Sequence, residues 1–114
     1  MNEILDDVKM HVEGSLADDH FDGLLVSYTN TAFMVLWQLG VGPDDPFTIS
    51  ISSESKWTDF LNDPSLELVK EYIYRKVQML FDPPQNSNAM ESSKNILEEM
   101  EWRIHDYANY KESF

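Results

Sequence analysis

Three histidines, at positions 11, 20 and 105, are the side chains of this sequence best suited to proton transfer or metal binding. They fall in different predicted elements, and none has the His-Glu-x-x-His spacing that places two imidazoles on one helical face for zinc. We therefore interpret them as surface or core-edge histidines. The sequence has no cysteine, which excludes a thiolate metal site, a disulfide and a cysteine nucleophile, and which fits a reducing compartment.

One short string has the form of a catalytic motif. Ser53 and Lys56 match the Ser-x-x-Lys string of penicillin-recognising enzymes, but the partner string Lys-Thr-Gly does not occur. The four glycines form no phosphate-binding loop, which disfavours a nucleotide enzyme. The sequence therefore predicts no catalytic residue and no cofactor, and it favours an interaction protein over an enzyme.

Acidic residues dominate the charge. The chain has 8 Lys and Arg against 21 Asp and Glu, a net charge of −13. The acidic clusters at 18–20 and 44–45 lack the twelve-residue calcium-loop pattern, so we interpret them as solvated surface and helix caps and expect no metal site. Sequence-reading DNA binding is disfavoured, because it needs cations against phosphates. An acidic channel wall, however, would let a duplex slide without sticking.

The length of 114 residues predicts a single domain. The apolar fraction of 42%, with three Trp, five Tyr and six Phe, predicts that it folds. The acidic start of the chain is unlike a signal peptide, and no apolar run approaches the ~18 residues of a spanning helix. We therefore expect a soluble protein that does not enter a membrane.

The elements expected to carry these residues are mostly helices. Apolar residues recur at spacings of three and four, which predicts helices over 2–12, 19–39, 65–81 and 88–109 and a helical turn over 57–61. Asp19 with Asp22, and Asn88 with Glu91, resemble capping boxes at two of the starts.

Residues 47–52 alternate apolar and hydroxyl side chains with a period of two, which predicts a half-buried strand. A lone strand needs a partner, either a hairpin formed by the segment around Trp57 or the edge of another subunit. The predicted fold class is therefore mainly α, a small bundle of about four helices with one short strand or hairpin segment.

Four ordered strings carry a resemblance to a known family. They are Gln38-Leu39-Gly40-Val41-Gly42-Pro43, Trp57-Thr58-Asp59-Phe60, the run from Val69 through Tyr74 into Leu80-Phe81-Asp82-Pro83-Pro84-Gln85-Asn86-Ser87, and Glu99-Met100-Glu101-Trp102-Arg103-Ile104. In order and spacing the chain resembles small head-tail connector, or adaptor, proteins of long-tailed bacteriophages and of prophages of Gram-positive bacteria. The resemblance covers residues from about 29 to 107.

The resemblance implies a structural virion protein in the neck, made in the cytoplasm of the bacterial host. Such proteins form a ring, commonly of twelve copies, beneath the portal protein. The ring extends the DNA channel toward a stopper or tail-completion protein, and DNA passes through it without sequence-specific binding. Neither an enzymatic activity nor a cofactor is implied.

Under this hypothesis three sets of residues acquire expected roles. Structural residues set the turn after the central helix, anchor the strand segment, or fix the angle between the last two helices: Gly40, Gly42, Pro43, Trp57, Phe60, Pro83, Pro84 and Trp102. Candidates for contacts between subunits are Phe47, Ile49, Ile51, Glu101 and Arg103. Candidates for docking on the portal lie in or next to a flexible or docking tail over 109–114: Tyr107, Tyr110, Lys111 and Phe114.

Other functions stay open on the sequence. The nearest alternative is another joining protein of the virion, a stopper or a tail terminator. A small acidic regulator that imitates DNA is a third possibility, although the acids are scattered rather than placed in two rows. A small metal-dependent enzyme ranks last.

Overall fold

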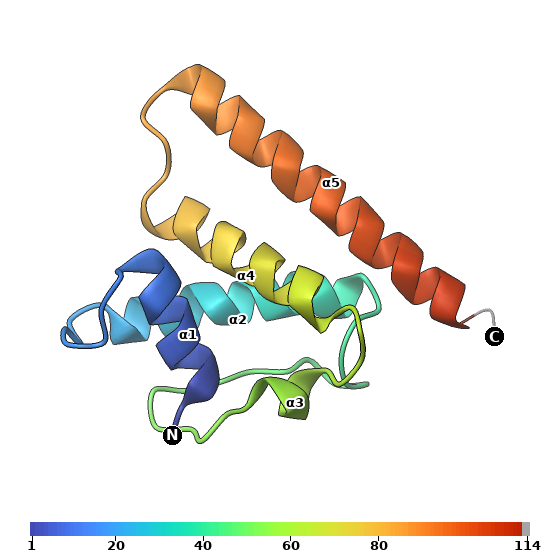
Figure 1. Ribbon diagram of the computed structural model, residues 1–114, viewed down its shortest axis with the longest axis horizontal. Helices are drawn as coiled ribbons and strands as arrows, with labels where there is room; N and C mark the ends of the chain where they lie inside the picture. Colours follow the sequence, from blue (N-terminus) through green and yellow to red (C-terminus); the bar gives the residue numbers. More distant parts are fainter. Residues whose placement is uncertain (113–114) are drawn as a thin grey trace.

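The computed structural model describes residues 1–112, and this part of the chain forms five helices (Figure 1). They are α1 (Glu3–Val12), α2 (Asp22–Gln38), α3 (Trp57–Phe60), α4 (Leu66–Phe81) and α5 (Ser87–Glu112). Each corresponds to a helix or helical turn predicted from apolar spacing. The mainly α, small helical bundle is therefore confirmed.

Helices α1, α2 and α4 pack against one another and enclose the core. Its largest fully buried side chains come from these three helices: Ile4, Val8, Leu25, Thr29, Phe33, Leu36, Val69, Tyr72, Ile73 and Val77. Thr29 is tolerated there because its hydroxyl donates to the Leu25 carbonyl at 2.7 Å. Leu24, near the start of α2, is 42% exposed.

The predicted capping residues are displaced from the observed helix starts. Helix α2 begins at Asp22 rather than Asp19, and the Asp22 carboxylate lies 2.9 Å from the Lys9 ammonium group. At the start of α5, Asn86 rather than Asn88 is the cap, because its side-chain oxygen accepts from the Asn88 and Ala89 amides at 2.7 and 3.2 Å. Helix α5 also continues through Glu112, beyond the predicted end at Asn109.

The prediction of a strand over 47–52 is wrong, since no strand forms within residues 1–112. The segment is bonded to side chains instead of to a second strand. Asn30 of α2 donates to the Ile49 carbonyl at 3.0 Å and accepts from the Ile49 amide at 2.9 Å. Asn2 donates to the Ser50 carbonyl at 2.8 Å. These asparagine side chains take the place of a strand partner, which period-two alternation does not reveal.

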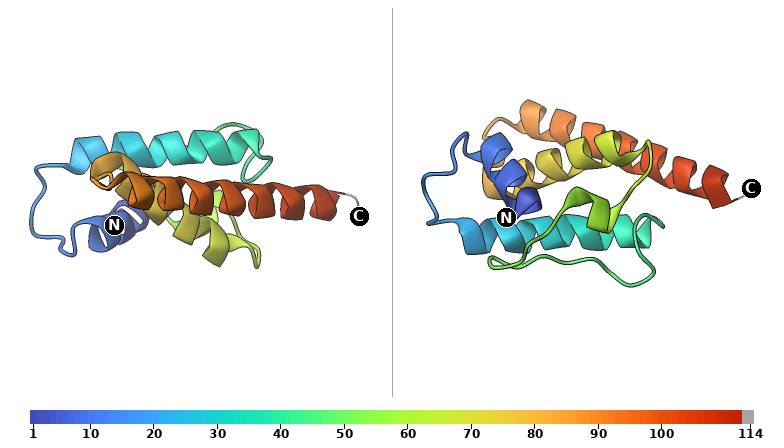
Figure 2. Two further views of the ribbon diagram at one scale, coloured as in Figure 1. Left: turned by 90° about the horizontal axis from the view of Figure 1, so that it is seen from above. Right: turned by 60° about the horizontal axis from the view of Figure 1, so that its bottom comes forward.

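Helix α5 lies along one side of this core and packs on α4 (Figure 2). The whole molecule is flat, with principal extents of 45 × 38 × 19 Å. Pro83 and Pro84 lie in the link where the chain turns from α4 into α5. None of the helices in residues 1–112 combines the length and apolar composition needed to cross a bilayer.

Candidate interaction surface

The two sides of α5 differ sharply in burial. Leu97, Met100 and Ile104 face inward and are at most 8% exposed. Trp102 and Tyr110, by contrast, are 67% and 62% exposed, and Tyr107 is 36% exposed. Large aromatic side chains that remain this open to solvent are typical of surfaces that bind another protein. The C-terminal half of α5 is therefore the first candidate site.

These aromatic residues border an open groove between α5 and the start of α4. Its volume is about 450 Å³, and we call it the aromatic groove; its lining residues are Pro64, Ser65, Leu68, Trp102, Arg103, Asp106, Tyr107 and Tyr110. Trp102, Asp106 and Tyr110 are spaced by four residues, so they form one row along the helix. A carboxylate thus stands between two aromatic rings on the α5 side of the groove.

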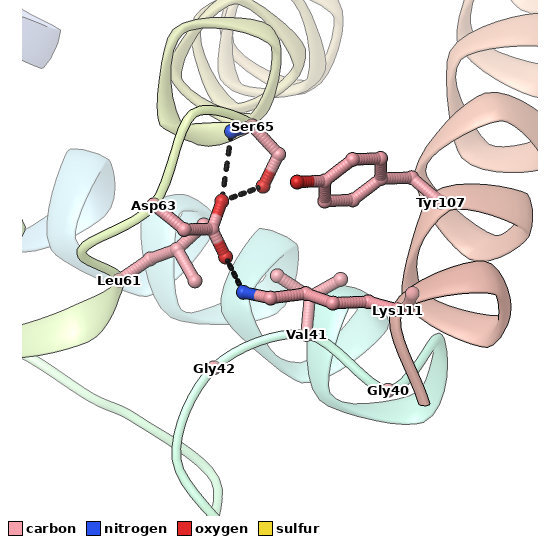
Figure 3. A pocket seen from close by; sticks show the side chains of 9 residues that line it. Gly40, Val41, Gly42, Leu61, Asp63, Ser65, Tyr107 and Lys111 are labelled. Atoms are coloured by element: carbon pink, nitrogen blue, oxygen red, sulfur yellow. Dashed lines mark hydrogen bonds and ion pairs between the residues drawn. The ribbon is translucent and has the colours of Figure 1, made fainter. Parts of the chain in front are cut away.

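A second, smaller pocket of about 310 Å³ lies beside the groove, where the end of α5 meets the turn after α2 (Figure 3). Lys111 of α5 donates to the Asp63 carboxylate across 2.6 Å. Asp63 also accepts from the Ser65 amide at 2.7 Å, at the start of α4. Tyr107 points toward Ser65 from the α5 side (Figure 3). Asp63 therefore joins the beginning of α4 to the end of α5.

The electrostatics of this joint follow from its hydrogen bonds. Burial acts to raise the pKa of the Asp63 carboxyl, but the hydrogen bonds from Lys111 and Ser65 outweigh it and hold the pKa below its ordinary value. The hydrogen bond to Asp63 in turn raises the pKa of Lys111. Both groups are charged at neutral pH, and their contact holds the last turn of α5 on the body of the molecule.

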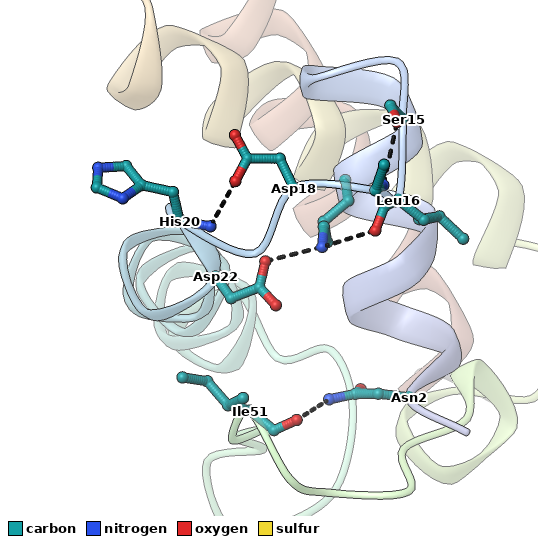
Figure 4. A network of polar contacts seen from close by, with 9 residues as sticks. Asn2, Ser15, Leu16, Asp18, His20, Asp22 and Ile51 are labelled. Atoms are coloured by element: carbon teal, nitrogen blue, oxygen red, sulfur yellow. Dashed lines mark hydrogen bonds and ion pairs between the residues drawn. The ribbon is translucent and has the colours of Figure 1, made fainter.

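A buried ion pair sets the connection between α1 and α2 (Figure 4). Lys9 is only 4% exposed, its ammonium lies 2.9 Å from the Asp22 carboxylate, and it is 3.5 Å from the Leu16 carbonyl oxygen. The hydrogen bond to Asp22 raises the pKa of Lys9, although burial opposes this shift. Sequence reasoning missed this pair, because a lysine and an aspartate thirteen positions apart carry no helical spacing signal.

Two of the predicted subunit contacts pack against their own chain. Ile49 is 5% exposed, and the ring of Phe47 packs against Phe33 and Phe60 with centroids 5.0 and 5.4 Å apart. Ile49 is thus buried within its own chain, whereas Phe47 is half-buried. Ile51, in contrast, is 57% exposed.

The two charged candidates on α5 also have partners within the chain. Glu101 accepts from the Tyr72 hydroxyl at 2.7 Å, and Arg103 donates to Glu99 at 2.9 Å. Burial, and secondly the bond to Glu101, raise the pKa of Tyr72 far above its ordinary value. Glu101 thus accepts the hydrogen bond of the buried Tyr72 hydroxyl group.

Several of the predicted structural residues lie in the turn after α2 or in α3. Gly40 and Gly42 have φ angles of 87° and 99°, the left-handed region that glycine accepts without strain. Trp57 and Phe60 are 3% and 4% exposed. The Trp57 indole donates to Asp7 of α1 at 2.7 Å, which ties α3 to the first helix. Trp102, in contrast, projects outward.

The remaining sequence candidates do not converge. His11 stacks on Tyr74 with ring centroids 3.7 Å apart, whereas His105 lies near Asn109 on exposed α5. The Ser53 hydroxyl donates to the Ser50 carbonyl at 2.9 Å within a turn. In the described residues, no three His, Cys, Asp or Glu side chains gather closely enough to hold a metal ion. Of the portal-docking candidates, Phe114 lies outside the described residues.

The described residues, 1–112, form a small helical bundle with an open aromatic groove, an arrangement suited to binding another protein. Residues 4–111 match the family described as phage connector protein. The chain belongs to this family, which confirms the resemblance to head-tail connector proteins. No curated protein and no solved structure matches the chain.

Proposed function

We propose that this chain is a head-tail connector that assembles as an oligomeric ring beneath the portal in the neck of a phage particle. The ring extends the DNA channel and joins the head to the tail through a stopper or tail-completion protein. The observation that carries this proposal is the match to the connector family over nearly the whole chain.

The distribution of exposed apolar side chains supports a ring. Trp102 and Tyr110 lie on α5, whereas Leu24 and Ile51, 42% and 57% exposed, lie at the start of α2 and the loop beside it. The start of α2 and the end of α5 are at opposite ends of the molecule (Figures 1 and 2). A closed ring of identical subunits needs two different complementary faces on each subunit, and these groups supply apolar surface at both ends.

The net charge of −13 supports a channel through which DNA moves. Five of the eight basic side chains are paired with acids of the same chain, which lowers the positive charge that they present to phosphates: Lys9, Lys70, Arg75, Arg103 and Lys111. An acidic wall repels the phosphate backbone and leaves a duplex free to slide.

Mass photometry of the purified chain, alone and mixed with the portal protein of the same phage genome, tests the proposal. We expect little self-association alone, because each added subunit brings another −13 of charge. With the portal we expect a complex of about a dozen copies. Failure to bind the portal, together with stoichiometric binding to a tail-tube protein, would instead favour a different joining protein of the virion.

Removing the end of α5 tests whether it docks on the portal. A chain truncated after Asn109 lacks Tyr110 and Lys111, and hence also the contact with Asp63. We expect it to keep its helical circular dichroism, since its core helices are intact, and to lose portal binding in the mass-photometry assay. Portal binding at the level of the full chain would rule out docking through this segment.

A further inference from the structure

Beyond Asp22, helix α2 carries no charge, which sets it apart from the other long helices. From Gly23 through Pro43 the sequence has no Asp, Glu, Lys, Arg or His, although charged residues make up 25% of the whole chain. Helices α1, α4 and α5 each contain acidic and basic residues. Burial does not account for this neutrality, because part of α2 faces solvent.

Five uncharged side chains form a row along the solvent side of α2. We call this row the neutral stripe, and its members are Leu24, Ser27, Thr31, Met34 and Gln38. Their alternating spacing of three and four residues places them on one face of the helix, the spacing at which helices pack on one another. All five are exposed, Leu24 and Met34 by 42% and 41%. In the left view of Figure 2, α2 lies along one edge of the molecule, so the stripe is accessible to a partner.

We propose that the neutral stripe is a contact between two copies of this chain. The stripe of one copy packs against a different face of the next copy, as a closed ring of identical subunits requires. Ile51, which lies beside Gly23 at the start of α2, extends the contact with a further apolar side chain. The proposal rests on the proposed function for the ring and deepens it by naming one of the two faces that meet.

The absence of charge selects a second copy as the occupant of the stripe. Two copies with a net charge of −13 each repel one another, and the repulsion is smallest where the facing side chains are neutral. Burying neutral side chains also avoids the cost of removing charges from water. A partner of opposite charge would instead gain from facing acidic side chains, which the stripe lacks.

The size of the stripe indicates a contact that is weak between free copies. The helix rises about 21 Å between Leu24 and Gln38 and is about 10 Å wide, so the stripe covers roughly 200 Å². A stable complex buries about 800 Å² on each partner. We therefore expect free copies to associate with a Kd on the order of 1 mM, and a ring to form on the portal, which holds neighbouring copies together.

The first test follows the backbone amide NMR signals of the full chain as its concentration rises from about 0.05 to 2 mM, a range that brackets the expected Kd. In about 0.5 M NaCl, where repulsion between copies is screened, we expect the amides of the stripe and of a second, separate patch to shift. The shifts should shrink at about 0.05 M NaCl. Signals of the stripe that do not move, or shifts confined to the stripe as in a symmetric pair of α2 helices, would overturn the inference.

Two variants with the same substitution separate the stripe from the overall charge. Thr31→Lys places a lysine in the middle of the stripe, whereas Thr58→Lys places one at an exposed position of α3. Both lower the net negative charge equally, so repulsion between copies falls equally in both. We nevertheless expect Thr31→Lys to weaken the association by about tenfold, because it buries an unpaired charge, and Thr58→Lys to leave it unchanged or stronger. Equal association of the two variants would refute the contact.

The number of copies per portal, measured by mass photometry, distinguishes this inference from the proposed function. We expect Thr31→Lys to form incomplete rings and Thr58→Lys to form full ones. If the wild type and Thr31→Lys both form full rings, the connector function stands and the inference fails. If the wild type binds no portal but its stripe signals shift with concentration as expected, the contact between copies stands and the proposed function fails.

Discussion

Gly42 is the residue at which local backbone geometry and core packing meet. Its φ angle of 99° disfavours any residue with a Cβ atom, and a Cβ there would lie 2.6 Å from Cε1 of Phe60. Phe60 is only 4% exposed and packs against Phe33 and Phe47, so its ring has little room to move away. Gly14 has a similar φ of 74° but nothing within 4 Å.

Gly42→Ala should therefore cost more stability than Gly14→Ala. Left-handed strain alone predicts a loss of about 1–2 kcal/mol for Gly14→Ala. The clash with Phe60 adds to this at position 42, so we expect about 2–5 kcal/mol for Gly42→Ala. Urea denaturation of both variants measures the difference, and equal losses would show that Phe60 accommodates the methyl group.

A second single residue, Tyr72, makes the stability of the fold depend on pH. Burial, followed by its bond to Glu101, raises the pKa of Tyr72, and burial together with Asp7 raises that of Tyr74. The pKa of such a tyrosine hydroxyl is about 10 in the unfolded chain and higher in the folded chain. The difference stabilises the fold, and this stabilisation is fully present below pH 10. That contribution is lost as the pH rises above 10, because the unfolded chain then releases a proton that the folded chain retains.

We accordingly expect the free energy of unfolding to fall above pH 10, and to fall less steeply in Tyr72→Phe than in the wild type. The variant loses about 0.5–1.5 kcal/mol at neutral pH, because its hydrogen bond to Glu101 is missing. Urea titrations at pH 8 and at two values above pH 10 provide the comparison. If the free energy of unfolding fell equally steeply in the two proteins, Tyr72 would not be a source of the pH dependence.

At the scale of elements, one side chain decides the conformation of the segment after α2. Asn30 pairs with both backbone groups of Ile49, at 3.0 and 2.9 Å, and thereby fixes this segment along the helix. The carboxamide matches a peptide group in having one donor and one acceptor, so it can replace a strand neighbour. The segment in turn places Ile49 in the core and Ile51 in solvent.

Asn30→Ala should leave the Ile49 amide and carbonyl without these partners. We expect a loss of about 1–3 kcal/mol in the free energy of unfolding. Relative to the wild type, hydrogen exchange of the Ile49 amide should accelerate more than that of amides in α4. Thr31→Ala is a matched control, because Thr31 is exposed and bonds only to the Ser27 carbonyl of its own helix. Unchanged exchange at Ile49 in Asn30→Ala would show that packing alone holds the segment.

At the scale of the whole molecule, assembly depends on the apolar surface that folding leaves uncovered. Ile51 is a predicted subunit contact whose apolar side chain remains open, and it lies beside the start of α2, with its Cδ1 3.8 Å from where a Gly23 Cβ would stand. The start of α2 and the C-terminal end of α5, which lines the aromatic groove, lie at opposite ends of the molecule (Figure 1). Ile51 is therefore suited to meet a different face of a neighbouring subunit.

Ile51→Ser should reduce the number of copies bound per portal in mass photometry while changing the stability of the isolated chain by less than about 0.5 kcal/mol. Leu16→Ser, at another exposed loop position, is the matched control and should retain the full complement. A full ring formed by Ile51→Ser would exclude Ile51 from the contact between subunits.

The sequence by itself determined the helices, their breaks and the family. Apolar spacing of three and four residues is a local property of a helix, and glycine or proline ends a helix through its own backbone restrictions. For the same reason the turn at Gly40 and Gly42 and the break at Pro83 and Pro84 could be placed in advance. The four ordered strings were enough to indicate the connector family.

Tertiary structure alone decided which surfaces are open. Ile49, expected at a subunit contact, is buried in its own chain and Phe47 is half-buried, because Asn30 and Phe33 of α2 supply the partners that a lone strand lacked. Trp102 was expected to be structural and is instead the most exposed aromatic of α5. Burial depends on residues distant in the sequence, such as Asp63 and Lys111, whose contact no local pattern encodes.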